Sequence, residues 1–170
     1  CRVVLDLGRP LEAIPDNEAA LPSVPGLDGS DRSLLGVIVS HPHADHCGLI
    51  PLLAPQVPVY MGAGAHRVLT EAAFFTEQEA PPPLSGALQH RRPFDLGPFH
   101  ITPFLVDHSA FDSYAILVEA EGKRLFYSGD LRAHGRRAWL VEELLQAEEC
   151  RIRWQKRLVT LWGCDLRTAR

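Results

Sequence analysis

A continuous apolar run that leads directly into a cluster of histidines constrains the fold of this chain more than any other feature. Residues 34–39 are Leu-Leu-Gly-Val-Ile-Val, and such a run is typical of a strand buried on both faces. After Ser40, residues 41–46 read His-Pro-His-Ala-Asp-His. Because functional side chains gather where loops leave a rigid scaffold, we expect a site at the end of this strand.

Other segments predict strands that alternate with a few helices. Proline-rich stretches, including four prolines between residues 10 and 25, exclude a long helix near the start. The chain shows no internal repeat, and the mixture of elements predicts an α/β (α+β) sandwich. Expected strands cover residues 2–7, 34–40, 57–61, 94–106 (two strands split by Gly97-Pro98), 114–118 and 124–127; expected helices cover 63–76 and 138–146, with helical turns within 47–53.

Length and composition describe one domain of ordinary size. The chain has 170 residues and a net charge of −4, which is enough sequence to bury a sizeable core. It contains no apolar run near the roughly 18–20 residues that cross a bilayer, and no leader pattern at its start. The four cysteines show no close pairing and are expected to be ordinary thiols, so a reducing, cytoplasmic location is predicted.

Charge divides the chain into two unequal parts. Residues 1–150 hold 11 basic against 20 acidic side chains, whereas residues 151–170 hold 6 against 1 and carry two of the three tryptophans. All 14 prolines lie in the first part. We therefore predict a folded domain over residues 1–147 and a basic tail over 148–170, which is either a native basic helix or sequence joined from a shifted frame or gene junction.

The cluster at residues 41–46 has the composition of a metal site. Neutral imidazole and carboxylate are ligands that zinc, iron and manganese accept. A turn that leaves a strand can direct His41 and His43 at one ion, with Asp45 and His46 at a neighbouring position. A solvated histidine-rich turn is the alternative, but four potential ligand residues at this density favour metal binding.

Two further strand ends carry ligand residues. Asp107-His108-Ser109 follows the expected strand that ends at residue 106, and Ser128-Gly129-Asp130 follows the one that ends at residue 127. A single histidine or aspartate at a strand end is usually a cap or turn residue. In combination with the cluster at residues 41–46, His108 and Asp130 are interpreted as ligands.

In this order, the motifs resemble the metallo-β-lactamase-fold hydrolases. His41-x-His43-x-Asp45-His46, then His108, then Gly129-Asp130 match the family's motifs, and Asp6 matches its structural aspartate. The segments His-Ser-Ala-Phe-Asp-Ser at 108–113 and Tyr-Ser-Gly-Asp at 127–130 are more narrowly similar to the ribonuclease J and β-CASP nucleases. The resemblance spans residues 3–147 and implies an αββα sandwich.

The resemblance implies a site for two divalent ions, with zinc expected and manganese or iron as alternatives. His41, His43 and His108 would hold one ion, and Asp45 and His46 the other, with Asp130 bridging. A metal-bound hydroxide would then attack a phosphodiester, with Asp45 and Asp130 as catalytic residues. Residues expected to orient the ligand imidazoles, unless they only shape turns, are Asp107, Ser109 and Asp112.

The chain also departs from the family pattern. The family completes the second ion's ligands with a histidine from its carboxyl-terminal half, and the one histidine after Asp130, His134, is too close to match. The inserted β-CASP domain and the first strand of the opening hairpin are absent. We therefore expect the amino-terminal portion of a longer enzyme, with an incomplete sandwich whose exposed edges favour self-association.

The expected function is hydrolysis of RNA or another phosphodiester. Arg132 and Arg136 are candidate phosphate contacts, although a solvated basic turn is the more common role for such residues. The acidic body of the chain gives no long-range attraction for nucleic acid. Two alternatives remain: a small-molecule hydrolase of the same fold that acts on a lactam, lactone or thioester, and a fragment that binds metal without catalysis.

Overall fold

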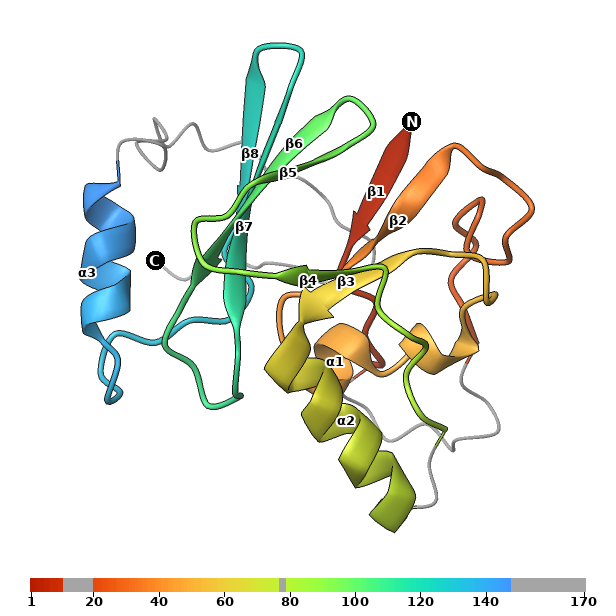
Figure 1. Cartoon of the computed structure of the whole chain (residues 1–170), viewed down its shortest axis with the longest axis horizontal. Coiled ribbons are helices and arrows are strands. Elements are labelled where there is room, and N and C mark those ends of the chain that lie inside the picture. The colour runs from red at the N-terminus through yellow and green to blue at the C-terminus, as the bar shows by residue number, and fades with distance from the viewer. Residues whose placement is uncertain (11–19, 77–78, 148–170) are drawn as a thin grey trace.

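A computed structural model describes residues 1–10, 20–76 and 79–147 of the chain (Figure 1). The predicted basic tail at 148–170 lies outside the described residues. The strands are β1 (Arg2–Leu5), β2 (Leu34–Ile38), β3 (Val59–Gly62), β4 (Gly86–Leu88), β5 (Phe94–Leu96), β6 (Phe99–Leu105), β7 (Tyr114–Ala120) and β8 (Lys123–Tyr127). The helices are α1 (Ala44–Cys47), the 3-10 helix η2 (Ile50–Leu52), α2 (Ala63–Thr76) and α3 (Trp139–Gln146).

The strands form two four-stranded sheets of different kinds. The first sheet has the order β1-β2-β3-β4 with every neighbouring pair parallel, and the second has the order β5-β6-β7-β8 with every pair antiparallel. The helices α1 and α2 accompany the first sheet, while α3 lies beside the second (Figure 1). Parallel strands need crossover connections, and α1, η2 and the chain around them provide one between β2 and β3.

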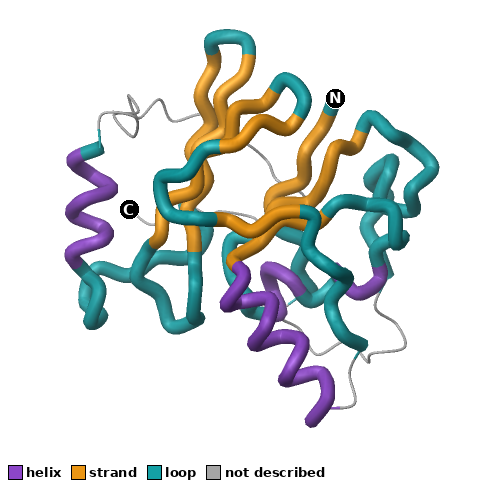
Figure 2. Tube along the Cα trace, in the orientation of Figure 1, coloured by secondary structure: helices purple, strands orange, loops and turns teal. Residues whose placement is uncertain are grey.

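Three apolar clusters fill the spaces between the layers of the molecule. The cluster between the sheets contains Ile38 of β2 and Ile116 of β7. A second cluster joins the other face of the first sheet to its helices and contains Val37 and Ala65, and a third joins the second sheet to α3 through Leu117 and Leu144. The order helix, sheet, sheet, helix is visible in Figure 2 and confirms the predicted αββα sandwich.

Strand β7 shows how the sequence produces this layering. Successive side chains of a strand point to opposite faces of its sheet. Tyr114, Ile116 and Val118 belong to the cluster between the sheets, whereas Ala115 and Leu117 belong to the cluster under α3. Both faces are buried over residues 114–118, so these five positions of β7 are all apolar instead of alternating with polar residues.

Several predicted elements differ from the structure at their ends. Helix α2 covers the predicted residues 63–76, and the two strands at 94–106 are separated at Gly97-Pro98 as expected. The sequence predicts helical turns within residues 47–53. The first turn, α1, lies earlier, at residues 44–47, and so includes Asp45 and His46. Within residues 48–53, only the three residues of η2 are helical. Strand β4 was not predicted, because its three residues gain strand structure only by pairing with β3.

The sequence predicts that Trp139, Leu140, Leu144 and Leu145 share one apolar side of α3, and this prediction is partly wrong. Leu140 and Leu144 are buried as expected, but Trp139 and Leu145 are 57% and 72% exposed. Val141 takes the third buried position instead. Residues 140, 141 and 144 are at positions i, i+1 and i+4, which lie on one face of a helix. Residues 139 and 145 lie outside that face.

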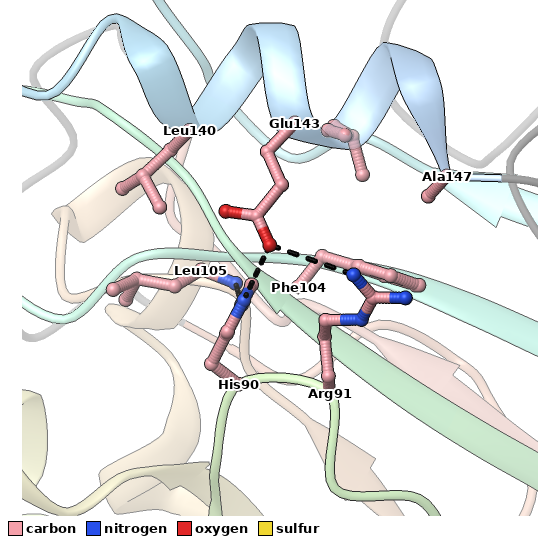
Figure 3. A pocket seen from close by; sticks show the side chains of 8 residues that line it. His90, Arg91, Phe104, Leu105, Leu140, Glu143 and Ala147 are labelled. Carbon is pink, nitrogen blue, oxygen red and sulfur yellow. Dashed lines mark hydrogen bonds and ion pairs between the residues drawn. The ribbon is translucent and has the colours of Figure 1, made fainter.

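Helix α3 packs on the second sheet through apolar residues and also makes a polar contact with the turn before β5. In the pocket of Figure 3, the Glu143 carboxylate lies 3.5 Å from both His90 Nε2 and Arg91 Nη1. The Leu105 backbone N–H donates to His90 Nδ1 at 3.0 Å, so this nitrogen accepts and Nε2 carries the ring proton that faces Glu143. The turn before β5 therefore contacts α3 at this point.

Some apolar side chains remain at the surface of the described residues. Phe74 and Phe75 at the end of α2 are 82% and 80% exposed. Strands β1, β4, β5 and β8 are the edges of the two sheets. Self-association through such surfaces stays a prediction. None of the helices in the described part of the chain combines the length and the apolar character needed to cross a membrane.

Candidate metal centre

The ends of three strands bring the predicted ligands to one place. Strand β2 leads into His41, β6 leads into His108 and β8 leads into Asp130. Strands β6 and β8 both run antiparallel to β7, so their carboxyl ends lie at the same edge of the second sheet. A hydrogen bond from the Tyr114 backbone N–H to the Ser40 carbonyl, 2.9 Å long, joins this edge to the end of β2.

Three imidazoles and one carboxylate form a compact group. His43 Nδ1 lies 3.2 Å from His41 Nε2 and 3.2 Å from His108 Nε2. Asp130 Oδ2 lies 3.9 Å from His41 Nε2 and 3.8 Å from His108 Nε2. The four ligand atoms all lie within 4.8 Å of one another, which is the spacing of groups that can share one ion.

His46 and Asp45 lie on the other side of Asp130. His46 Nε2 is 3.5 Å from Asp130 Oδ1 and 3.8 Å from Asp45 Oδ2. The two oxygens of the Asp130 carboxylate therefore face different histidines, with Oδ2 toward His41 and His108 and Oδ1 toward His46. The structure thus brings the five other predicted ligand residues together near the Asp130 carboxylate.

Asp6 fixes the orientation of His46 by contacting Nδ1, the ring nitrogen on the side away from Asp130. This residue follows β1 and has a φ of 60°, a left-handed conformation that aspartate tolerates better than most residues. Its Oδ2 accepts from His46 Nδ1 at 2.6 Å and from the Tyr127 hydroxyl at 2.6 Å. Because a carboxylate only accepts, His46 Nδ1 carries the proton, and the lone pair of Nε2 points toward Asp45 and Asp130.

Ser40 fixes the tautomer of His41 in the same way. The Ser40 hydroxyl donates to Asp6 Oδ2 at 2.7 Å and lies 2.9 Å from His41 Nδ1. A hydroxyl has one proton, so Ser40 Oγ accepts from the Nδ1–H of His41. The unprotonated Nε2 of His41 is therefore the atom that faces His43.

Burial and charge alter the proton affinities of these histidines. Burial, with a smaller contribution from the neighbouring imidazoles, lowers the pKa of His41 to about 4, so His41 is neutral at physiological pH. Burial and the charge of His43 lower the pKa of His108. Burial opposes protonation of His46, but the hydrogen bond to Asp6 and the carboxylates of Asp130 and Asp45 raise its pKa overall.

Gly129 allows Asp130 to approach the end of β2. Its φ of 52° is left-handed, and a Cβ atom there would lie 3.0 Å from both Cβ and Oγ of Ser40. A residue with a side chain would push the Asp130 segment away from Ser40 or distort its backbone. The Gly-Asp pair in the sequence is thus explained by close packing between the two sheets.

The other predicted site residues make contacts of their own or lie at the surface. Asp107 pairs with Arg132, and Asp112 Oδ2 accepts from the backbone N–H groups of Gly64 and Ala65 at the start of α2. Ser109 and Arg136 are exposed. Ser40 and Tyr127 were not identified from the sequence, because their role depends on a partner, Asp6, that lies 34 and 121 residues away.

The donor set is chemically suited to a divalent ion. Ring nitrogens of three imidazoles converge, with His43 Nδ1 3.2 Å from both His41 Nε2 and His108 Nε2, and His46 Nε2 faces two carboxylates. Arrangements of like partial charge are unfavourable unless a cation or a proton lies between them. Nitrogen and oxygen ligands of this kind fit zinc, manganese and iron.

A family model described as "Beta-lactamase superfamily domain" matches residues 11–153. The chain belongs to the beta-lactamase superfamily. This assignment confirms the predicted metallo-β-lactamase-fold hydrolase family, and the two-sheet architecture agrees with it.

Individual proteins are similar to this chain over different shares of its length. Ribonuclease J of Sinorhizobium meliloti (strain Sm2011 / Rm2011 / 2011) is 27% identical over 119 residues, which are 69% of this chain and 21% of that protein. A protein of unknown function from Enterococcus faecalis V583 has 24% identity and a TM-score of 0.68, over 84% of this chain and 40% of its own. The metallo-β-lactamase fold protein YhfI from Bacillus subtilis has 22% identity and a TM-score of 0.49, over 75% and 50%. The chain therefore spans less than half the length of the first two proteins.

Proposed function

We propose that this chain is the metal-binding part of a phosphodiesterase that resembles ribonuclease J. His41, His43 and His108 would hold one divalent ion, and Asp45 and His46 would hold a second, with Asp130 as the bridging ligand. The observation that supports this assignment best is the position of Asp130, whose two oxygens face the two groups of histidines separately. Zinc is the expected metal, with manganese or iron as alternatives.

When bound, the ions would polarise a phosphoryl oxygen and lower the pKa of a water molecule toward neutrality. Side chains of this protein would orient the water and the metal ligands. Asp45, with its side chain 32% exposed, and Asp130 would orient the attacking water and accept its proton. Asp6 and Ser40 would keep the Nε2 lone pairs of His46 and His41 free for the ions.

The similarity to ribonuclease J supports a phosphodiester as the substrate. Two arginines that follow Asp130, Arg132 and Arg136, would be the phosphate contacts. Guanidinium groups suit this role because their planar fork matches two oxygens of a phosphate. Because the chain carries a net charge of −4, binding of RNA would depend on such local contacts and not on long-range attraction.

The experiment compares hydrolysis of a labelled single-stranded RNA and of a chromogenic lactam by the zinc- or manganese-loaded chain. The proposal predicts cleavage of the RNA and its loss in His43→Ala. His100→Ala is the matched control, because His100 is an exposed histidine paired with Asp95 at 2.7 Å on the β5–β6 hairpin. Hydrolysis of the lactam alone, or metal binding without hydrolysis of either compound, would contradict the proposed substrate.

A further inference from the structure

Asp107 and Arg132 form an ion pair at the edge of the metal centre. Arg132 Nε lies 3.4 Å from Asp107 Oδ2, and Arg132 Nη2 lies 3.5 Å from Asp107 Oδ1. The Asp107 side chain is 5% exposed, whereas that of Arg132 is 35% exposed. The Arg132 backbone N–H also donates to the Asp107 carbonyl at 2.8 Å, so the two segments are joined at the backbone and at the side chains.

The position of this pair is set by the ligands on either side. Asp107 directly precedes His108, and Arg132 follows Asp130 by two residues. Because Asp107 adjoins His108 and the Arg132 backbone N–H donates to the Asp107 carbonyl, the pair lies beside two of the proposed ligands.

Close packing holds the guanidinium in place. A Cβ atom on Gly135 would lie 1.9 Å from Asp107 Oδ2 and 2.5 Å from Arg132 Nε, so the backbone of residue 135 covers the pair directly. A buried carboxylate is costly without a partner, which makes Arg132 the residue that satisfies Asp107. The arginine is thus packed against Gly135 and paired with a buried carboxylate.

The pairing uses only one edge of the guanidinium. An arginine has five N–H groups, and the contacts with Asp107 involve Nε and one hydrogen of Nη2. The two hydrogens of Nη1 and the second hydrogen of Nη2 form another edge, which can bind two oxygens of a phosphate. Arg132 therefore has the geometry of an anchored anion ligand.

We infer that Asp107 holds Arg132 so that its outer edge binds the non-bridging oxygens of a phosphodiester beside the metal centre. This inference rests on the proposed function, and it distinguishes Arg132, which has a buried carboxylate partner, from the exposed Arg136. It makes the negative charge of the substrate a requirement for tight binding.

The test measures binding without requiring turnover. The zinc-loaded chain is titrated calorimetrically with the thymidine dinucleotide and with its methylphosphonate analogue, which has nearly the same shape but lacks the negative charge. The variants are Arg132→Gln, Arg132→Lys and the control Arg137→Gln, which removes an equal charge from an exposed residue of the same segment. Zinc content is measured for every variant.

We expect the wild-type chain to bind the charged dinucleotide more tightly than the analogue. Arg132→Gln should weaken binding of the charged dinucleotide by about tenfold, because a charge-assisted pair of hydrogen bonds is lost, without a change for the analogue. Arg132→Lys should recover part of the affinity, since lysine keeps the charge but not the fork. Arg137→Gln should behave as wild type.

Three results would overturn the inference. They are an equal affinity of the wild-type chain for the two dinucleotides, an equal loss for both in Arg132→Gln, and loss of zinc from both Arg132 variants. The last two would show that the pair only supports the fold of the centre. If the charged dinucleotide binds through Arg132 but RNA is not cleaved, the proposed reaction is refuted and the anion site stands.

Discussion

Asp6 Oδ2 lies 2.6 Å from His46 Nδ1 and thereby fixes which nitrogen of His46 faces the candidate metal centre. The same carboxylate accepts from the Tyr127 hydroxyl at 2.6 Å and from the Ser40 hydroxyl at 2.7 Å, while its Oδ1 accepts from the Ser40 backbone N–H at 2.6 Å. Four donors from three segments of the chain therefore meet at one side chain. A substitution of Asp6 should therefore alter the orientation of His46, and of His41 through Ser40.

Asp6→Asn tests this relationship. An amide of the same shape replaces one carboxylate oxygen by an N–H donor, so it cannot accept from all four groups. We expect zinc affinity to fall roughly 10- to 100-fold, as for other residues that orient a ligand imidazole, measured by competition with a chromophoric chelator. Asp95→Asn is the matched control, because Asp95 also accepts from a histidine but lies away from the centre. Equal affinities of Asp6→Asn and wild type would refute the positioning role.

Acid should destabilise the metal-free chain through His41. Burial lowers the pKa of His41 from 6.5 to about 4, so the unfolded chain binds a proton in this range that the folded chain does not. Stability is therefore lost as the pH falls from 6.5 toward 4, by up to about 3 kcal/mol if His41 acts alone.

Urea unfolding of the chelator-treated chain at several pH values measures this loss, and His41→Gln should show a smaller dependence on pH. His46 acts in the opposite sense, because its raised pKa stabilises the fold at low pH and that contribution is lost as the pH rises. The comparison of the variant with wild type isolates His41. Identical pH profiles of the two proteins would exclude His41 as the source of acid sensitivity.

Asp112 should stabilise helix α2 from a distant loop. Its Oδ2 accepts from the Gly64 N–H at 2.8 Å and the Ala65 N–H at 3.4 Å, which are donors at the helix start that lack partners within the helix. Asp112→Ala should therefore reduce the free energy of unfolding by about 1 kcal/mol, and Asp112→Asn by less, since asparagine can also cap. A larger loss in Asp112→Asn than in Asp112→Ala, measured by urea unfolding, would contradict this role.

Glu143 should contribute modestly to the attachment of α3. It faces His90 and Arg91 at 3.5 Å each, but its side chain is 37% exposed, so solvent weakens both contacts. Glu143→Gln should lower the free energy of unfolding by about 0.5 kcal/mol. Glu142→Gln on the exposed side of the same helix is the control and should have no measurable effect. Equal effects of the two substitutions would show that the contact is not specific.

The sequence allowed prediction of the features that depend on local pattern. The buried run before His41 predicted β2, and the spacing of apolar residues predicted α2 with its observed ends. The sequence also indicated that the six candidate ligand residues lie together, because the three segments that carry them each follow a strand. The resemblance identified Asp6 as structural, but its four donors come from residues 34, 40 and 121 positions away, which no local pattern encodes.

Contacts between distant segments account for the features that could not be predicted. Strand β4 depends on pairing with β3, and the partner of Asp112 is the start of a helix 48 residues earlier. The exposed Trp139 and Leu145 show the same limit, since hydrophobicity alone does not determine which residues of a short helix face the sheet. The contact of Arg132 with Asp107 likewise appears only when β6 and β8 lie in the same sheet.

The central claim is that Asp130 and five residues near it bind two divalent ions. The most direct test is the number of zinc ions per chain at saturation, measured by elemental analysis and by titration calorimetry. We predict two ions for the wild-type chain, with weaker binding of the ion next to His46, and one ion for His46→Ala. Binding of one ion or none by the wild-type chain would contradict the account.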